Sequence, residues 1–358
     1  MAPDGEIVTP GRYDGRLDVT VVIAVAPGAD PGRALQAVGR GLPRGVRAEI
    51  LTVTGSHPSR QRNLAANRAA GRVLYFLDHD AVVDPATIGR LLAAMRRLGA
   101  EVAGGPNLPA PPKSPLEAIL GGVIASPVGS PFVSARYGSR SATGRAGERS
   151  LILCNLAIKR EPFLAAGGFD PRLYPNEENA LLNRLARRGI PAVHVHDASV
   201  RKPRPATWRR FVVETFRYGR GRMQQIWVAP AVGDVVFAGA LVVALAGVFG
   251  SFVYAWIPVL YGAVVAVESG RLLLGTGARG ASAGARFVSY LAGFVLRHAA
   301  YASGMVWGAL TGWRMRRLRW RPMRATLRRF GPKRGGMRLV ETVSCKIGSM
   351  AKEAAPHA

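Results

Sequence analysis

The strongest constraint in this sequence is a short apolar run that ends in two acids. Val73–Leu77 is wholly apolar, which is typical of a strand buried on both faces of a parallel sheet. Asp78 and Asp80 follow directly, at the end of the strand where α/β sheets bind ligands. Burying two carboxylates together is costly unless a positive group lies between them. The pattern favours a divalent cation that carries a phosphorylated ligand, and the alternative is that the acids only cap the following loop or helix.

The residues around this run alternate between strand-like and helix-like segments. Ser59 is placed to cap a helix, and Gly71 to end it. The predicted elements are strands at Val19–Val25, Ala48–Val53 and Val73–Asp78, and helices at Gly32–Gly41, Arg60–Ala70 and Pro85–Leu98. This order predicts a doubly wound, mostly parallel α/β sheet with right-handed crossovers, an architecture that binds nucleotides. The chain contains no G-x-G-x-x-G or Walker sequence, so neither a dinucleotide site nor a P-loop is supported.

The pattern is less regular beyond Leu98. We expect short strands at Glu101–Gly105 and Leu151–Ile158, and a helix that runs from about Asn176 to Arg188. Between them, residues 106–149 are rich in Pro, Gly, Ser and Arg, with long irregular stretches. Such segments are usually either functional or disordered, and this one is expected to shape the acceptor side of a site.

Charge and cysteine content narrow the choice of partner and compartment. Lys and Arg number 49 against 22 Asp and Glu, a net charge of +27, which indicates a polyanionic partner. The basic runs Arg201–Arg222 and Met315–Arg334 flank a strongly apolar region, which favours an anionic membrane over nucleic acid. Cys154 and Cys345 fit no metal-ligand spacing and indicate a reduced, cytoplasm-facing protein. Residues 1–18 are polar, lack the features of a signal peptide and are expected to be flexible.

The apolar region predicts helices that associate with a membrane. Val235–Val267 has 33 residues without a charge. As one helix it would span about 50 Å, well over the ~30 Å of a hydrocarbon core, so we expect a hairpin of two short spans. Phe287–Leu310 is a third apolar segment, but Arg297 in its middle favours a position in the interface or a re-entrant path.

These features divide the chain into an α/β domain at residues 19–225, a membrane region at 226–312 and a basic cytoplasmic tail at 313–358. The positive-inside rule keeps the tail on the cytoplasmic side, together with the α/β domain. A tail and an N-terminal domain on the same side of the membrane require an even number of crossings. Three full spans are the alternative, and they would place the ten basic residues of Arg314–Arg334 outside.

Several motifs occur in the order typical of one enzyme family. They are Gln61-Arg62-Asn63, Asp78-His79-Asp80, Gly167-Gly168-Phe169-Asp170, Asn176-Glu177-Glu178 ahead of Leu181 and Arg184, and Tyr218-Gly219-Arg220-Gly221-Arg222. Over Val19–Arg222 the chain resembles family 2 glycosyltransferases of the GT-A fold, in particular the membrane-associated type from exopolysaccharide assembly. The resemblance implies that a sugar moves, with inversion, from a nucleotide-sugar donor to an acceptor.

The resemblance also implies roles for the acids. Asp78 would face the nucleotide sugar, and Asp80, with Asp78 as a second ligand, would bind Mg²⁺ or Mn²⁺ to neutralise the departing diphosphate. The family usually has Glu-Asp here, with the second acid as the base, so Glu178 would be the general base for the acceptor hydroxyl. Glu177 is the alternative, because Glu178 has one methylene more than the usual Asp. Both could instead be ordinary first-turn acids favoured by the helix dipole. The family often has a later His near the metal, but Arg201 looks best placed here, so no third ligand is assigned.

Other polar residues complete the predicted site. Arg62 and Asn63 are expected to face the donor, unless they form a solvated helix face. Arg220 and Arg222 are expected to clamp the diphosphate, and attraction to lipid headgroups is the alternative. Asn155 is the candidate for acceptor binding. The Gln-x-x-Arg-Trp motif of processive relatives is incomplete in this chain, which predicts transfer of a single residue.

The sequence therefore leads to the hypothesis of a membrane-anchored, metal-dependent inverting glycosyltransferase. Its donor would be a nucleotide sugar and its acceptor a lipid-linked or cell-surface glycan. Its catalytic domain would face the cytoplasm at the inner or plasma membrane, where anionic lipids attract the basic runs. One alternative is a scaffold protein that kept the fold and lost activity. The other is a soluble nucleic-acid binder, whose binding would weaken with salt.

Overall fold

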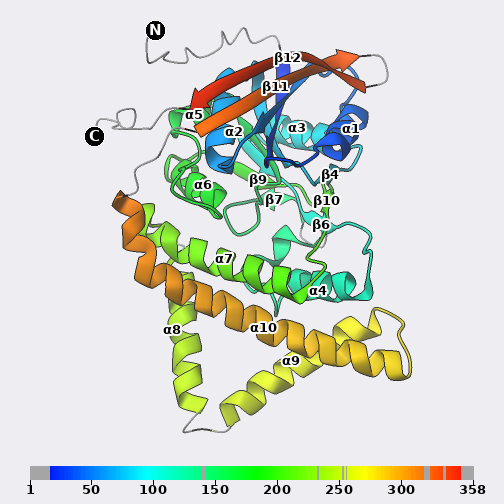
Figure 1. Ribbon diagram of the computed structural model, residues 1–358, viewed down its shortest axis with the longest axis vertical. Coiled ribbons are helices and arrows are strands. Elements are labelled where there is room, and N and C mark those ends of the chain that lie inside the picture. The colour runs from blue at the N-terminus through cyan, green and yellow to red at the C-terminus, as the bar shows by residue number, and fades with distance from the viewer. Residues whose placement is uncertain are drawn as a thin grey trace.

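The computed structural model describes residues 17–138, 142–231, 234–251, 254, 256–317, 323–333 and 336–347. The strands are β1 (Leu17–Val25), β2 (Ala48–Thr54), β3 (Gly71–Asp78), β4 (Val82–Val83), β5 (Val102–Gly104), β6 (Asn107–Pro109), β7 (Gly144–Arg145), β8 (Asn155–Lys159), β9 (Ala192–His194), β10 (Val200–Lys202), β11 (Met323–Lys333) and β12 (Gly336–Ile347). The α-helices are α1 (Gly32–Gly41), α2 (Pro58–Arg68), α3 (Thr87–Arg97), α4 (Pro115–Ala125), α5 (Arg160–Ala165), α6 (Glu177–Arg187), α7 (Trp208–Val228), α8 (Asp234–Ser251), α9 (Trp256–Leu274) and α10 (Ala281–Thr311). An α/β part lies over a layer of long helices (Figure 1).

The α/β part is built on one large mixed sheet. Among the described residues its strand order is β12-β11-β2-β1-β3-β8-β5-β9-β7. β1 pairs in parallel with both β2 and β3, so that Val21 lies opposite Ile50 and Tyr75. β8 runs antiparallel between β3 and β5. The predicted α/β fold with a β-α-β-α-β start is therefore confirmed.

Helices cover both faces of this sheet, which explains why its central strands are apolar throughout. Val21 and Ile23 belong to the apolar cluster formed with α1 and α3, whereas Val22 belongs to the cluster formed with α2, α5 and α6. One predicted detail is wrong: α2 begins at Pro58, and the Ser59 hydroxyl donates to the carbonyl of Leu173 instead of capping the helix. This contact ties α2 to the segment that leads into α6.

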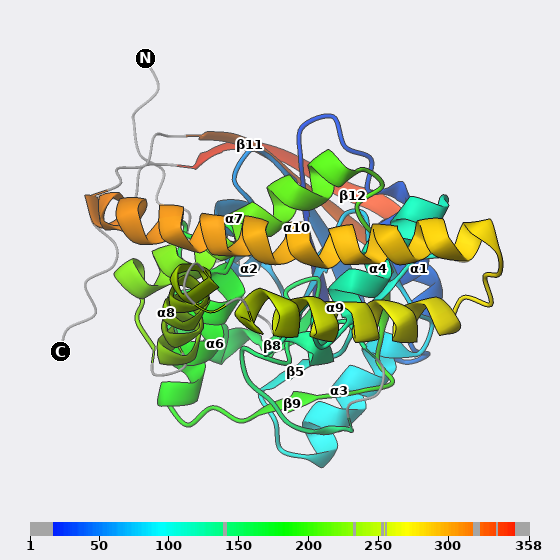
Figure 2. The same cartoon turned by 90° about the horizontal axis from the view of Figure 1, so that it is seen from below.

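The helical layer is held together by a close contact between α7 and α10. Figures 1 and 2 show the two helices side by side. A Cβ atom at Gly219 would overlap the carbonyl of Tyr301, and one at Gly304 would overlap the carbonyl of Phe216. Glycine is therefore required where the two backbones touch. The glycines of the Tyr218–Arg222 motif lie inside a helix and serve packing, because a Cβ at Gly221 would meet the backbone of Pro175.

Helices α8 and α9 form a V on the far side of α10 from the sheet (Figures 1 and 2). They correspond to the stretch predicted as a hairpin, and the third apolar segment lies within α10. Of the described helices, only α9 is long and apolar enough to cross a membrane, with a mean hydropathy of 1.5. The apolar part of α8, Val236–Ser251, is shorter.

The chain returns to the sheet after α10. β11 pairs antiparallel with β2, from Thr326 opposite Thr54 to Phe330 opposite Ile50. Leu327 is buried in the same core cluster as α2. These residues belong to the stretch that the sequence analysis assigned to a tail, and the structure instead makes them part of the large mixed sheet. The sequence reading missed this because β11 pairs with a strand about 270 residues earlier, and no local pattern predicts a partner so far away in the chain.

We expect Leu327→Ala to destabilise the α/β part by about 2–5 kcal/mol, because it leaves a cavity in the core. Leu339→Ala is the matched control, since Leu339 lies on the neighbouring strand β12 and is 53% exposed. Chemical unfolding followed by circular dichroism measures both. Equal stability of the two variants would contradict the packing of β11 onto β2.

Candidate active site

A cavity of about 690 Å³ lies at the carboxyl ends of β1, β2 and β3. Asp78 ends β3 and Asp80 follows in the turn, and both line the cavity. The start of α6, with Glu177 and Glu178, and Lys202 at the end of β10 also line the cavity. The structure thus brings together the two acidic pairs that the sequence analysis singled out, although they lie about a hundred residues apart.

A lysine that the sequence analysis did not select lies between the two aspartates. Lys202 Nζ is 2.7 Å from Asp78 Oδ2 and 3.2 Å from Asp80 Oδ1. Burial would lower the pKa of Lys202, but the charges of both aspartates outweigh it and hold that pKa well above its usual value. Burial opposes ionisation of Asp78 in turn, yet Lys202 and Arg62 keep its pKa well below the usual range. The positive group expected between the carboxylates is therefore an ammonium.

A small second sheet, in the order β4-β10-β6, places this lysine. β10 pairs antiparallel with β4, which begins two residues after Asp80, and parallel with β6. Successive residues of a strand point to opposite sides. Lys202 therefore faces the aspartates while Arg201 faces away and pairs with Asp84 at 3.2 Å. The sequence analysis chose Arg201 at this position, and the correct residue is one step further along the strand.

Arg62 joins the two acidic pairs. Its Nη2 lies 3.0 Å from Asp78 Oδ1 and its Nη1 lies 2.9 Å from Glu177 Oε1. Gln61, the preceding residue of α2, donates to the carbonyls of Val25 and Val53 and so fixes α2 against the ends of β1 and β2. Arg62 lines the cavity as predicted, but its guanidinium is already shared by two carboxylates.

Glu177 and Glu178 open α6 after Asn176, which has a left-handed φ of 86°. Burial, together with the charge of Glu178, raises the pKa of Glu177 to about 8 against the opposing effect of Arg62. Glu178 Oε1 lies 3.5 Å from Arg136 Nη1. Arg136 also donates to Asn179 Oδ1 at 2.5 Å and to the carbonyl of Glu148. Both glutamates face the cavity, and each has one arginine beside it.

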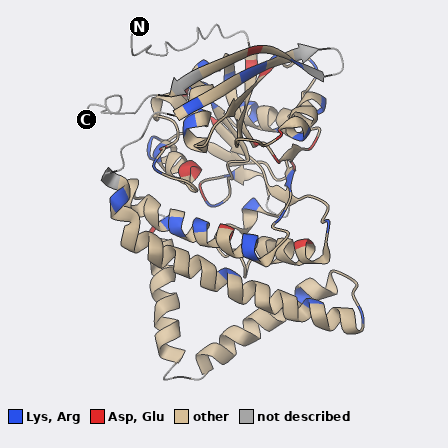
Figure 3. Cartoon of the chain, viewed as in Figure 1, with Lys and Arg blue, Asp and Glu red and all other residues tan. Residues whose placement is uncertain are grey.

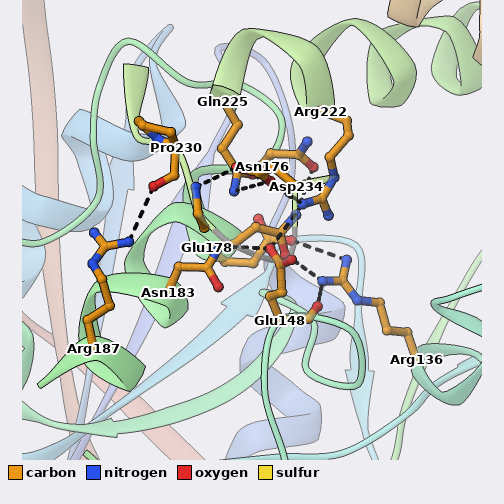
Figure 4. Close-up of polar contacts among 12 residues, drawn as sticks. Arg136, Glu148, Asn176, Glu178, Asn183, Arg187, Arg222, Gln225, Pro230 and Asp234 are labelled. Carbon is orange, nitrogen blue, oxygen red and sulfur yellow. Dashed lines mark hydrogen bonds and ion pairs between the residues drawn. The ribbon is translucent and has the colours of Figure 1, made fainter. Parts of the chain in front are cut away.

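Of the two arginines predicted to clamp the diphosphate, Arg222 lines the cavity and Arg220 does not. Arg222 is buried and pairs with Glu148 at 2.9 Å and with Asp234 at 3.5 Å (Figure 4). Its guanidinium also stacks on Phe237, 3.9 Å from the ring centre. Arg220 contacts the carbonyl of Tyr174 and is not among the described residues that line the cavity. The sequence cannot reveal these acidic partners, because Glu148 lies in an irregular segment and Asp234 on the next helix.

Two asparagines predicted to bind substrates have structural roles instead. Asn63 donates a hydrogen bond to the carbonyl of Phe169 and accepts one from its backbone N–H. These two bonds hold the Gly167–Asp170 turn against α2. Asn155 is fully buried, accepts from the Tyr75 hydroxyl at 2.9 Å and donates to the carbonyl of Ala198 at 2.7 Å. All their hydrogen-bonding atoms have partners in the fold, so neither side chain is available to donor or acceptor.

The sequence analysis also missed Lys202, Arg136 and Glu148. A signal existed for Lys202, because Val200-Arg201-Lys202 is a strand-like stretch in the region where a cation was expected. The sequence does not determine which of the two adjacent basic residues points toward the aspartates, because a shift of one residue exchanges the two faces of a strand. No comparable signal marks Arg136 or Glu148, since both lie in the irregular segment that carries no periodic pattern.

Comparison with known proteins agrees with this arrangement. The family model described as "Glycosyltransferase like family 2" matches residues 12–221. Because the match covers more than half of the chain, the protein belongs to glycosyltransferase family 2 and is a glycosyltransferase. Membership implies a nucleotide-sugar donor and an acceptor. A search of the curated proteins gives no significant match.

Enzymes of this family commonly use a divalent metal, and the residues present do not complete a site for one. Asp78 and Asp80 supply two carboxylates, but the Lys202 ammonium lies between them. In the part of the chain that the structure describes, no group of three or more His, Cys, Asp or Glu side chains could hold a metal ion. Hard cations such as Mg²⁺ take about six oxygen ligands and tolerate no ammonium among them. The donor set therefore fits a lysine better than a metal.

The raised pKa of Glu177 predicts a pH dependence of stability. Its ordinary value is 4.5 and its folded value about 8, so between these pH values the folded protein binds a proton that the unfolded chain has lost. The free energy of unfolding then falls as the pH rises through this window. We expect Glu177→Gln to remove that part of the fall, so that the melting temperature of the variant relative to wild type rises from about pH 5 to about pH 8.

Differential scanning calorimetry across this pH range measures the effect. Glu161→Gln is the control, because Glu161 is also a first-turn glutamate but is exposed on α5. Its melting temperature relative to wild type should not change with pH. A Glu177→Gln difference that is equally flat would contradict the raised pKa.

Proposed function

We propose that the protein transfers a single sugar residue, with inversion, from a nucleotide diphosphate sugar to an acceptor hydroxyl. The observation that carries this proposal is that Asp78 and Asp80, at the end of β3, line the same cavity as Glu178. Donor diphosphate and acceptor hydroxyl both need to lie in line with the anomeric carbon, and one cavity that holds groups for each meets this need. Family membership supports the reaction class, and the geometry supports the roles of the residues.

Glu178 acts as the general base. The acceptor oxygen attacks the anomeric carbon, its proton passes to the Glu178 carboxylate, and the bond from that carbon to the diphosphate oxygen breaks. Glu177 is held by Arg62 and is only 2% exposed, so it positions the donor side of the site. Arg136 fixes the orientation of Glu178. The Mg²⁺ or Mn²⁺ expected from the family would need the carboxylate oxygens that Lys202 already contacts, and no step in this scheme depends on it.

The acceptor is proposed to be carried by a lipid or a membrane-bound glycan. The cavity extends from the catalytic residues to Phe237 of α8 and to Arg297 and Tyr301 of α10. An acceptor held at the membrane could therefore reach Glu178 from the side of these helices. The helices α8 and α9 carry few charges (Figure 3) and expose Val243, Phe249 and other large apolar side chains. An exposed apolar surface of this kind is typical of a membrane or partner contact.

The fold supports an even number of crossings. β1 and β11 belong to the same sheet, so both lie on one side of any membrane that the helices between them enter. The α8–α9 pair can enter the bilayer and return, while α10 remains against α7. This arrangement favours the predicted hairpin over three full spans. The nucleotide sugar and the basic runs place this side in the cytoplasm, at the inner or plasma membrane, next to anionic lipids.

Sugar transfer from a panel of UDP, GDP, ADP and TDP sugars tests the proposed reaction. We expect Glu178→Gln to lower kcat by about 10²–10⁴-fold, because it removes the proton acceptor. Glu161→Gln is the matched control: if Glu178 were only a favourable first-turn acid, both variants would behave alike. Equal turnover by wild type and Glu178→Gln would refute the mechanism. An inactive wild type that still binds these donors would favour the scaffold alternative.

Flotation with vesicles of phosphatidylglycerol and phosphatidylcholine tests the membrane contact. We expect the double variant Val243→Glu, Val259→Glu to lose most of its vesicle binding, because both side chains are at least 70% exposed and an acid is costly in hydrocarbon. Leu98→Glu is the control, since Leu98 is exposed at the end of α3 in the α/β part. Unchanged flotation of the double variant would show that α8 and α9 do not enter the lipid.

A further inference from the structure

We propose that the Lys202 ammonium is the cation that binds the donor diphosphate, and that transfer by this chain needs no divalent metal. The inference rests on the proposed function and departs from the metal use common in the family. Its basis is the position of Lys202 Nζ, 2.7 Å from Asp78 Oδ2 and 3.2 Å from Asp80 Oδ1, with all three residues lining the cavity.

The ammonium lies where a dication would have to bind. Mg²⁺ takes carboxylate oxygens at about 2.0–2.1 Å, so a metal and the Lys202 ammonium cannot share the same oxygens of Asp78 and Asp80. The backbone of Lys202 is held in place, because Lys202 lies opposite Pro109 of β6 and the preceding residues Val200 and Arg201 pair with both β4 and β6. Metal binding would therefore require the side chain to abandon two ion pairs while its backbone stays in place.

The local charge balance favours the lysine as well. The carboxylates of Asp78 and Asp80 already face two cations, Lys202 and Arg62, and Arg62 also pairs with Glu177. A dication added here would lie close to two fixed positive charges, and the Coulomb repulsion is largest where water is excluded. Among the described residues, no group of three or more His, Cys, Asp or Glu side chains is placed to hold a metal ion against that repulsion.

An ammonium in this position can do what the reaction asks of a cation. It has three N–H donors, and the two aspartates take at most two of them. The third can donate to a diphosphate oxygen in the cavity. When the bond from the anomeric carbon to the diphosphate breaks, its electron pair stays on the diphosphate, and the charge of Lys202 stabilises it there. Asp78 and Asp80 then serve to hold Lys202 in position.

Binding of UDP, GDP, ADP and TDP to the full-length protein, measured by isothermal titration calorimetry in EDTA and in Mn²⁺, tests this inference. We expect wild type to bind its preferred diphosphate with essentially the same affinity under both conditions. Lys202→Met should weaken binding in EDTA by about tenfold or more, because a charge-assisted hydrogen bond is lost. Lys202→Arg, which keeps the charge, should retain most of the affinity.

Arg201→Met is the matched control, because Arg201 is the adjacent cation on β10 and faces away from the cavity toward Asp84. It should bind as wild type does. Wild-type binding that requires Mn²⁺, or equal binding by Lys202→Met in EDTA, would overturn the role of Lys202 and leave the proposed transfer intact. A wild type that binds none of the diphosphates under either condition would overturn the proposed function itself.

Discussion

The site depends on the neutralisation of carboxylates at the end of β3. Asp78 closes a strand whose preceding side chains are buried, and a lone charge in such a place would be costly. Arg62, 16 residues earlier, and Lys202, 124 residues later, supply the opposing charge from two other elements. One ionic cluster therefore fixes α2, β3 and β10 relative to each other. The same cluster lines the cavity, so the ion pairs that fix these three elements also give the cavity its positive groups.

A second buried cluster connects this site to the long helices. Arg222 of α7 contacts Glu148 of the irregular segment and Asp234 at the start of α8, and the nearby Arg136 contacts Glu178 (Figure 4). Breaking a buried ion pair by removing one partner is strongly destabilising, because the other charge remains unpaired. Glu178 and the beginning of the apolar hairpin are thus held by adjacent interactions. This explains why the helical layer lies so close to the catalytic residues.

The two ends of the described chain meet in one sheet. β11 covers the edge of β2, which would otherwise expose unpaired backbone groups. Arg329 of β11 contacts the buried Glu49 of β2 at 2.5 Å, so the basic C-terminal stretch contributes a specific charge to the α/β part. The helices between residues 228 and 312 are therefore inserted between strands of one and the same sheet.

The sequence by itself determined the fold class, the parallel core and the acidic pairs, because each depends on short patterns: continuous apolar strands, helix-flanked turns and carboxylates at their ends. Only the tertiary structure decided which cation faces Asp78 and Asp80, because a strand one residue out of register would present Arg201 in place of Lys202. It also showed that Arg222, Asn63 and Asn155 bind partners inside the protein. Those partners come from distant segments, and no local pattern encodes which of them a side chain meets once the chain is folded.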